Sequence, residues 1–466
     1  MHSTRQPARR WLAVPAMLAV AALVVLLAAA PSQADAPPAA PPDRFVTTQL
    51  PDSPAGRQLG WFIEASRRLP ISDAELSAHF APAVLASPQG SPTAINELLR
   101  TLIDDSGVEL LGLTVAEPNR VFAILTGRGD RELTLILVID DAGLIGGATL
   151  NPVLALPEPS GPAAVGTDVV EVVDPARAGR RLVLTRWYPA ATHAADRPLA
   201  NYAGPALAAA LGLPPIRVHA RVAARARRGR LPVVLFSPGF GTPRVLYQAL
   251  AEDLASHGYL VVAVDHTGEA PVEHPDGRIT QPSTPPRHPI AAATATRLAD
   301  MRLVLRRLNT MAGGPRADRR RIAAIGHSLG GSTAAALMRA EPSIRAGVDM
   351  DGSIFGAARK RGVRRAFLLM LAGRSPDASI RDLLTHSSGP RLALAFTGFE
   401  HMSFSDLPVI GADGPGVGRT PSARDVLAQR AYLRAFLDRY VLGRRARLLD
   451  GPSPRFPQVH VRYRAR

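Results

Sequence analysis

The stretch Ile325-Gly326-His327-Ser328-Leu329-Gly330-Gly331 combines residue types and spacing that point directly to chemistry. It contains a G-x-S-x-G pattern between a short apolar run and a segment, 332–338, that is predicted to be helical. A serine on a tight turn between a strand and a helix is held in strained backbone geometry and exposed above the sheet. The N-terminus of the following helix favours developing negative charge. These features predict that Ser328 is a nucleophile.

A serine nucleophile needs a general base, and a histidine needs an acid that fixes its tautomer. When the serine lies on such a turn, the acid and the histidine follow it in that order. His401 comes just after the apolar run 391–396, a predicted final strand that would deliver it to the same sheet edge as Ser328. His386 is the alternative base, but it lies in a predicted helical segment before that strand. We therefore expect His401 to be the base.

The acid is sought in the run Ala346-Gly347-Val348-Asp349-Met350-Asp351-Gly352, which is predicted to end a strand after the nucleophile helix. Asp351 stands at the strand tip. Asp349 would point to the same side but deeper in the sheet, because side chains two residues apart share a face of a strand. Asp351 is the favoured acid, and Asp349 and Asp377 remain alternatives.

Acyl transfer also needs backbone donors directed at the oxyanion. The segment Phe236-Ser237-Pro238-Gly239-Phe240-Gly241 follows an early apolar strand, and its glycines allow the chain to turn its amides inward. We expect the N–H groups of Phe240 and Leu329 to be these donors. The alternative is a simple Pro-Gly turn.

The elements that position these residues are short apolar runs, most of them separated by segments of helical length. This alternation predicts an α/β fold with a doubly wound, mostly parallel sheet and helices on both faces. The runs are 181–187, 232–236, 259–264, 321–325, 347–350, 366–371 and 391–396.

Residues 166–405 resemble the α/β-hydrolase family of platelet-activating-factor acetylhydrolases. The matching pieces, in order, are Trp187-Tyr188-Pro189, Ser237-Pro238-Gly239-Phe240-Gly241, Ser256-His257-Gly258-Tyr259, Gly326-His327-Ser328-Leu329-Gly330-Gly331, Met350-Asp351-Gly352 and His401-Met402-Ser403-Phe404. The resemblance implies an esterase or lipase in which Ser328 is the nucleophile, Asp351 the acid and His401 the base. It also implies that Phe240 and Leu329 supply the oxyanion hole, and that no metal or cofactor is used.

A smaller α+β domain is expected over 43–153, where helical patterns precede three β-rich runs. This block resembles the cystatin-like N-terminal domain of certain actinobacterial exported β-lactamase-like proteins, through Pro54-Ala55-Gly56-Arg57-Gln58-Leu59, the region around His79-Phe80 and the ending Leu144-Ile145-Gly146-Gly147. It contains no cluster of serine, histidine and acid. We therefore expect a packing or binding module, followed by a linker at 154–166 and a catalytic domain at 167–466.

The first 34 residues have the layout of a signal peptide, with three arginines, the apolar run 11–30 and a cleavage point at Ser32-Gln33-Ala34. Residues 35–42 are rich in Ala and Pro and are expected to form a linker. We expect cleavage and secretion or a cell-envelope location, with a retained membrane anchor as the alternative.

Composition limits the possible partners and chemistry. The chain has no cysteine, which excludes disulfides and a cysteine nucleophile, and its formal net charge is +16. Nucleic-acid binding is not expected, because aromatic content is only 5% and no binding motif is present. An exposed cluster of arginines could contact an anionic membrane peripherally; its members are Arg217, Arg221, Arg225, Arg227, Arg228 and Arg230.

Together these observations predict an exported serine carboxylic-ester hydrolase that cleaves short-acyl lipid or related esters through an acyl-enzyme. A polyester or triacylglycerol hydrolase of the same fold is one alternative. A non-catalytic, hydrolase-like binding protein of the cell envelope is another.

Overall fold

The computed structural model describes residues 48–191, 194–213, 216–283, 290–311, 314–373, 375–412 and 414–465. The expected signal peptide at 1–34 and linker at 35–42 lie outside the described residues. Within the described ranges, no helix combines the length and the apolar character needed to cross a membrane.

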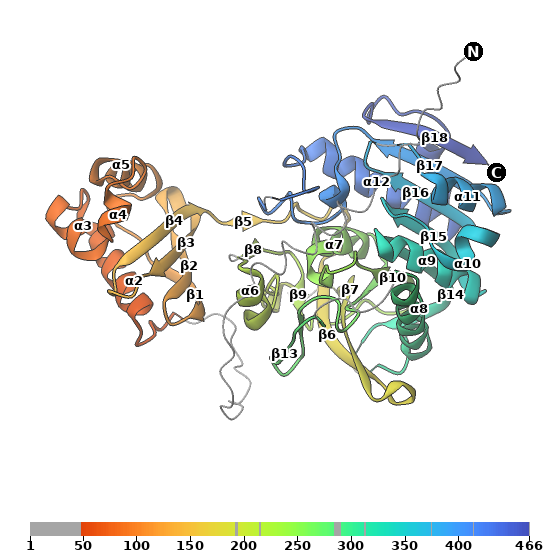
Figure 1. Ribbon diagram of the computed structural model, residues 1–466, viewed down its shortest axis with the longest axis horizontal. Coiled ribbons are helices and arrows are strands. Elements are labelled where there is room, and N and C mark those ends of the chain that lie inside the picture. Colours follow the sequence, from red (N-terminus) through yellow and green to blue (C-terminus); the bar gives the residue numbers. More distant parts are fainter. Residues whose placement is uncertain are drawn as a thin grey trace, which may run out of the picture.

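The N-terminal part is built from helices followed by an antiparallel sheet (Figure 1). Serines at the N-caps accept hydrogen bonds from the first turns of three of the helices. Apolar side chains of the helices and of one sheet face share a buried core that includes Leu59, Leu99, Leu135 and Leu137. The elements are α2 (Pro54–Ala65), α3 (Asp73–His79), α4 (Pro82–Leu85), α5 (Pro92–Leu102), β1 (Leu110–Glu117), β2 (Arg120–Thr126), β3 (Glu132–Ile139) and β4 (Ile145–Pro152).

A ten-stranded sheet organises the rest of the described chain, in the order β18-β17-β16-β15-β14-β10-β11-β7-β6-β9. The central strands from β17 to β11 are all parallel, and β7, β6 and β18 run antiparallel to the neighbours on their inner side. The strands are β6 (Val165–Asp174), β7 (Arg180–Pro189), β9 (Arg221–Val222), β10 (Arg230–Ser237), β11 (Leu260–Val264), β14 (Arg316–His327), β15 (Ile344–Met350), β16 (Ala366–Leu371), β17 (Arg391–Phe396) and β18 (Val459–Ala465).

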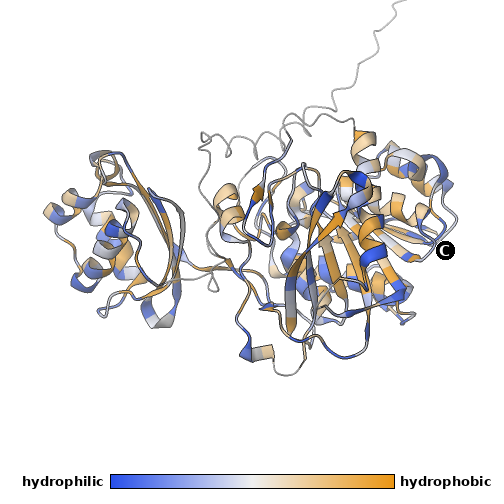
Figure 2. Cartoon of the chain, turned by 90° about the horizontal axis from the view of Figure 1, so that it is seen from below, coloured by the Kyte–Doolittle hydropathy of each residue, from blue (hydrophilic) through white to orange (hydrophobic). Residues whose placement is uncertain are grey.

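Helices cover both faces of this sheet, because each central strand is apolar on both faces. In β10, Val234 and Phe236 join one buried core, and Val233 and Leu235 join the other. Figure 2 shows hydrophobic residues concentrated on these strands. One core includes side chains of α7 (Gln248–Ser256) and α12 (Ala423–Tyr440), and the other those of α8 (Ile290–Arg307), α9 (Leu329–Ala340), α10 (Gly356–Arg361) and α11 (Ala378–His386).

This architecture confirms the predicted α/β fold with its doubly wound, mostly parallel sheet. The runs 366–371 and 391–396 coincide with β16 and β17, and the other five predicted runs fall on strands whose bounds differ by up to five residues. Two strands at or near the sheet edges, β6 and β18, were not expected. A short strand, β5 (Leu154–Ala155), and the first residues of β6 lie within the expected linker 154–166.

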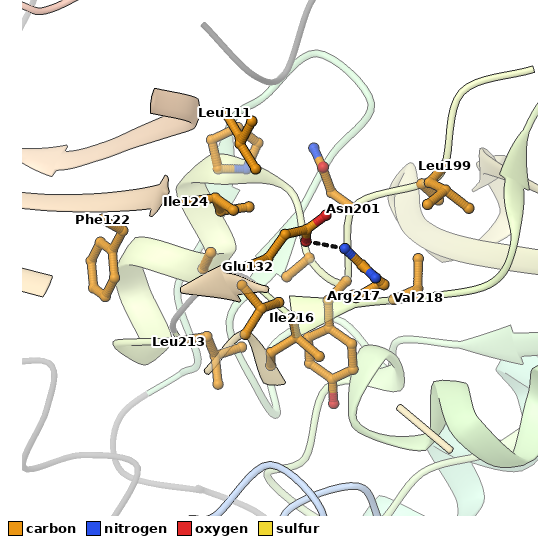
Figure 3. A pocket seen from close by; sticks show the side chains of 16 residues that line it. Leu111, Phe122, Ile124, Glu132, Leu199, Asn201, Leu213, Ile216, Arg217 and Val218 are labelled. Atoms are coloured by element: carbon orange, nitrogen blue, oxygen red, sulfur yellow. Dashed lines mark ion pairs between the residues drawn. The ribbon is translucent and has the colours of Figure 1, made fainter. Parts of the chain in front are cut away.

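A cavity of about 310 Å³ lies between the N-terminal part and the part built on the ten-stranded sheet (Figure 3). Phe122 and Ile124 approach it from the small domain, and Leu213 and Ile216 from the larger one. An ion pair between Glu132 and Arg217 joins the two sides. None of the predicted catalytic residues lines this cavity.

Candidate active site

Ser328 stands on the turn between β14 and α9, as the motif predicts. Its backbone has φ 55° and ψ −122°, a left-handed conformation that L-residues rarely adopt and that costs about 1–3 kcal/mol. The Ser328 N–H donates to the carbonyl of Met350 at the end of β15, over 2.8 Å. The turn is therefore tied to the strand that carries the predicted acid.

Two glycines allow this turn to approach its neighbours. A Cβ on Gly326 would lie 2.2 Å from the carbonyl carbon of Gly330, and a Cβ on Gly330 would lie 1.9 Å from the carbonyl oxygen of Ser237. Real Cβ contacts do not occur at such distances. The start of α9 thus packs directly on the segment that leads into the predicted oxyanion loop at Phe240.

Asp351 and His401 are brought together at the carboxyl edge of the sheet. The Nδ1 atom of His401 lies 2.8 Å from Oδ2 of Asp351, and Oδ1 of Asp351 accepts from the Ala372 amide over 2.9 Å. Asp351 is buried, whereas the His401 side chain is one-third exposed. Because Nδ1–H donates to the carboxylate, the tautomer leaves Nε2 of His401 free of a proton, as a general base requires.

The rival residues make different contacts. Asp349 is fully buried, and its Oδ1 accepts from the Gly352 amide over 2.9 Å. Asp377 caps α11, where Oδ1 accepts from the Ile380 amide over 2.9 Å. His386 ends α11, with Nδ1 lying 3.2 Å from the carbonyl oxygen of Arg359. The geometry therefore favours Asp351 and His401 over these alternatives.

The proposed nucleophile and base are linked through His327, the residue before the serine. Among the described residues, no hydrogen bond joins the Ser328 hydroxyl to the His401 ring. The centroid of that ring lies 4.6 Å from the ring centroid of His327, the residue before the serine. Catalytic hydrogen bonds are often long in the absence of substrate and tighten in the complex.

The predicted oxyanion donors lie on the two elements that meet at this turn. Leu329 is the first residue of α9, so its N–H has no carbonyl partner within the helix. Phe240 lies in the turn after β10, between Gly239 and Gly241. A Cβ on Gly239 would lie 3.1 Å from Nδ1 of His327, which places the loop against the nucleophile turn.

His327 was not singled out from the sequence, yet it joins three parts of the site. It is fully buried, its Nε2 lies 2.8 Å from the His401 carbonyl oxygen, and its Nδ1 lies 2.8 Å from the Tyr247 hydroxyl. A carbonyl only accepts, so Nε2 donates and Nδ1 accepts the Tyr247 O–H. Tyr247 in turn accepts from the Gly239 amide over 3.1 Å. The chain of bonds runs from the predicted oxyanion loop to the predicted base.

The protonation states agree with this arrangement. Burial lowers the pKa of His327 to about 3, so its ring stays neutral. Burial raises the pKa of Tyr247 to about 12, so its hydroxyl keeps the proton that it donates. The signal in the sequence was the position of His327 inside the G-x-S-x-G pattern, but nothing there indicated its partners.

Comparison with protein families gives two matches. Residues 230–389 match the family described as serine aminopeptidase, S33, and residues 50–145 match the one described as ORF 12 gene product N-terminal. The resemblance of the small domain to a cystatin-like domain stays a prediction.

Two curated relatives are esterases by name. A probable 1-alkyl-2-acetylglycerophosphocholine esterase of Arthroderma benhamiae is 29% identical over 371 residues, covering 65% of this chain and 92% of that protein. A platelet-activating factor acetylhydrolase of Bos taurus is 49% identical over 37 residues, which is 8% of each chain.

A solved structure extends the comparison to three dimensions. A ferulic acid esterase from Streptomyces cinnamoneus is 33% identical and superposes with a TM-score of 0.60, over 66% of this chain and 99% of that one. The large parallel sheet and the relatives agree, and the chain belongs to the α/β-hydrolase family as an ester hydrolase.

Proposed function

We propose that the protein is an exported serine carboxylic-ester hydrolase that cleaves short-acyl lipid or related esters through a Ser328–His401–Asp351 triad. One observation carries the assignment of the triad. His401 Nδ1 lies 2.8 Å from the buried Asp351 carboxylate, at the same sheet edge as the strained turn that bears Ser328. This is the pairing that leaves Nε2 able to accept the serine proton.

The reaction proceeds in two halves. Ser328 Oγ attacks the ester carbonyl carbon while His401 Nε2 takes the hydroxyl proton, and the carbonyl oxygen becomes an oxyanion that the N–H groups of Phe240 and Leu329 stabilise. The tetrahedral species collapses, the alkoxide leaves with the proton from His401, and an acyl-serine remains. Water then attacks the acyl group, again giving its proton to His401, and the acid departs as Ser328 regains its proton.

The names of the relatives support two substrate classes. The Arthroderma relative is named for an acetyl ester of an alkyl glycerophosphocholine, and the Streptomyces structure is named for a ferulic acid ester. We propose the short-acyl lipid ester as the substrate. The hydroxycinnamate ester is the second candidate, favoured by the match over nearly the whole of that structure.

A direct kinetic comparison tests these proposals. We expect 1-hexadecyl-2-acetylglycerophosphocholine to be hydrolysed with a higher kcat/KM than methyl ferulate. Ser328→Ala and His401→Ala should each abolish turnover of both substrates, and His386→Ala is the matched control that keeps it. Turnover that survives His401→Ala but not His386→Ala would contradict the assignment of the base, and a preference for methyl ferulate would select the second candidate.

Export is supported by the layout of the first 34 residues. We propose cleavage after Ala34, so that the mature chain begins at Asp35. N-terminal sequencing of protein recovered from the culture medium or the cell envelope of an expressing actinobacterium tests this. A protein that keeps its first residues and sediments with membranes would show the anchored alternative.

Peripheral membrane contact is proposed through the arginine cluster that precedes β10. Arg225, Arg227 and Arg228 are exposed, whereas Arg217 pairs with Glu132. Each basic residue near an anionic surface contributes about 1 kcal/mol. Sedimentation with phosphatidylserine vesicles should exceed that with phosphatidylcholine vesicles and should fall when Arg225, Arg227 and Arg228 are replaced by glutamine. Equal binding of the parent protein to both vesicle types would contradict the proposal.

A further inference from the structure

The oxyanion loop is held from behind by an arginine of helix α8. Arg297 is 1% exposed, and its guanidinium donates to two consecutive carbonyl oxygens of the loop. The Nη1 group lies 2.7 Å from the Pro238 oxygen, and the Nη2 group lies 3.1 Å from the Gly239 oxygen. A planar fork with several donors suits such paired contacts.

These two contacts determine where the neighbouring amides point. A trans peptide is planar, so the C=O of one residue and the N–H of the next point in opposite directions. The Pro238 carbonyl faces Arg297, and the Gly239 N–H accordingly points away from α8, where Tyr247 accepts it over 3.1 Å. By the same geometry the Gly239 carbonyl faces Arg297, so the Phe240 N–H also points away from α8. That N–H is the predicted oxyanion donor.

The guanidinium is itself fixed. Both carboxylate oxygens of Glu269 lie 3.0 Å from Nε of Arg297, and Nη2 makes a further contact with the same carboxylate. The start of the loop is held separately, because the Ser237 hydroxyl lies 2.9 Å from Nε2 of His266. Nδ1 of His266 lies 3.0 Å from Oδ2 of Asp300, three residues after Arg297 in α8. Helix α8 therefore holds three consecutive residues. It holds Ser237 through His266, and it holds Pro238 and Gly239 through Arg297.

The serine, histidine and aspartate of this second group resemble a catalytic triad in their bonding, but they are in the interior. Ser237 and Asp300 are 0% exposed and His266 is 5% exposed, so no ester reaches the hydroxyl. Arg297 Nη1 also lies 3.4 Å from the same hydroxyl. The group holds the end of β10 in place for the loop that follows.

We propose that Arg297 is a positioning residue that orients the Gly239–Phe240 peptide so that the Phe240 N–H faces the oxyanion. The inference rests on the proposed function, because it assumes acyl transfer at Ser328. Arg297 touches no reacting atom in this account. Its effect should therefore appear in the transition state and in its analogues, and not in the binding of the ground-state ester.

Arg297→Lys tests the proposal, because lysine keeps the charge and loses the planar fork. We expect kcat for p-nitrophenyl acetate to fall about 100-fold, near the effect of losing one oxyanion donor. KM should stay within about threefold of the parent value, since the lost interaction belongs to the transition state. The Ki of a trifluoromethyl ketone, which forms a tetrahedral adduct with the serine, should rise by a factor similar to the loss of kcat.

Arg430→Lys is the matched control. Arg430 is 4% exposed and also donates to three backbone carbonyls, those of Pro157, Glu158 and Ala249, away from the oxyanion loop. For Arg430→Lys, kcat and the Ki of the ketone should stay within about twofold of the parent values. An equal loss of kcat in both variants, an unchanged kcat in Arg297→Lys, or a rise in KM alone would overturn the proposal.

Glu269→Gln provides a second variant in case Arg297→Lys does not fold. The Glu269 side chain is 15% exposed, so the exchange disturbs the interior less. This variant should show a lower kcat and a higher Ki for the ketone. Both changes should be smaller than those caused by Arg297→Lys. No change in either quantity would overturn the proposal. A parent protein that neither hydrolyses esters nor binds the ketone would instead contradict the proposed function.

Discussion

The backbone at Ser328 and at Asp351 has φ 55° in both cases, a conformation that is uncommon for residues other than glycine. A backbone hydrogen bond to a neighbouring strand holds each residue there. The Ser328 N–H donates to the Met350 carbonyl over 2.8 Å, and the Asp351 N–H donates to the Met370 carbonyl over 2.7 Å. The sheet edge thus compensates for strain at the two positions that present the hydroxyl and the carboxylate.

The carboxylate of Asp351 should contribute far more to the rate of hydrolysis than the nearby carboxylate of Asp349. We expect Asp351→Asn to lower kcat by about 10⁴, because loss of the orienting acid leaves the imidazole in the wrong tautomer. Asp349→Asn should be milder, since Asp349 Oδ1 accepts from the Gly352 amide. Steady-state hydrolysis of p-nitrophenyl acetate gives kcat for both variants. Similar losses in the two variants would mean that Asp351 does not hold this role alone.

The neutral His327 ring predicts a pH dependence of stability. Burial lowers the pKa of His327 from 6.5 to about 3. Between these pH values the His327 ring is therefore protonated in the unfolded chain and neutral in the folded protein. Its contribution to the free energy of unfolding is therefore present above pH 6.5 and is lost as the pH falls towards 3. At pH 5 the loss is about 2 kcal/mol.

Urea denaturation at pH 8 and pH 5 measures this contribution. His327→Gln removes the titrating ring, so the variant should lose less stability than the parent protein between the two pH values. Comparing the parent with the variant cancels the titration of groups common to both. An identical loss in the two proteins would contradict a neutral, buried His327.

At the residue scale, the sequence was informative where a motif directly follows a strand. The pairing of Asp351 with His401 was predictable because parallel strands end at one edge, so residues just after them meet. Arg297, Tyr247 and His266 were not identifiable in this way. They act through backbone carbonyls, amides and buried partners that are distant along the chain, and no local pattern records such contacts.

At the element scale, the central strands were predictable because they are buried on both faces and form continuous apolar runs. The edge strand β18 was not predictable, because it contains Arg462, Tyr463 and Arg464 and is mostly exposed. Charged side chains are typical of an exposed edge, where they prevent pairing with another chain. His460 is part of this strand and pairs with Ala395.

The contact between α9 and the end of β10 should tolerate no added side-chain atom. Gly330→Ala would place a Cβ 1.9 Å from the Ser237 carbonyl oxygen. Because rigid backbone must shift, we expect a loss of about 3 kcal/mol in the free energy of unfolding, together with a loss of activity. Gly451→Ala, where nothing lies within 4 Å, is the control that should change neither quantity. Chemical denaturation that shows equal stability for both variants would contradict this packing.

At the scale of the whole molecule, the connection after Asp351 bears on substrate length. Before β16 begins at Ala366, this connection carries α10 alone among the elements of the described chain, which is too short for a separate cap domain. We therefore expect p-nitrophenyl acetate and butyrate to be cleaved more efficiently than the palmitate. An open site buries few of the methylenes that would each add about 0.8 kcal/mol.

Hydrolysis rates across the acyl series, with and without detergent, measure this preference. The rate should vary smoothly through the micellar transition of the substrate. A maximum at palmitate, or a sharp increase at that transition, would show a lid or a deep acyl tunnel.

Labelling of the intact protein with a fluorophosphonate tests the central claim most directly, because the reagent reports an activated serine without assuming a substrate. We predict one adduct per chain, located by peptide mass spectrometry on Ser328, with none on the buried Ser237. The adduct should be absent in Ser328→Ala and should form far more slowly in His401→Ala. An unlabelled parent protein, or an adduct on a different residue, would contradict the account.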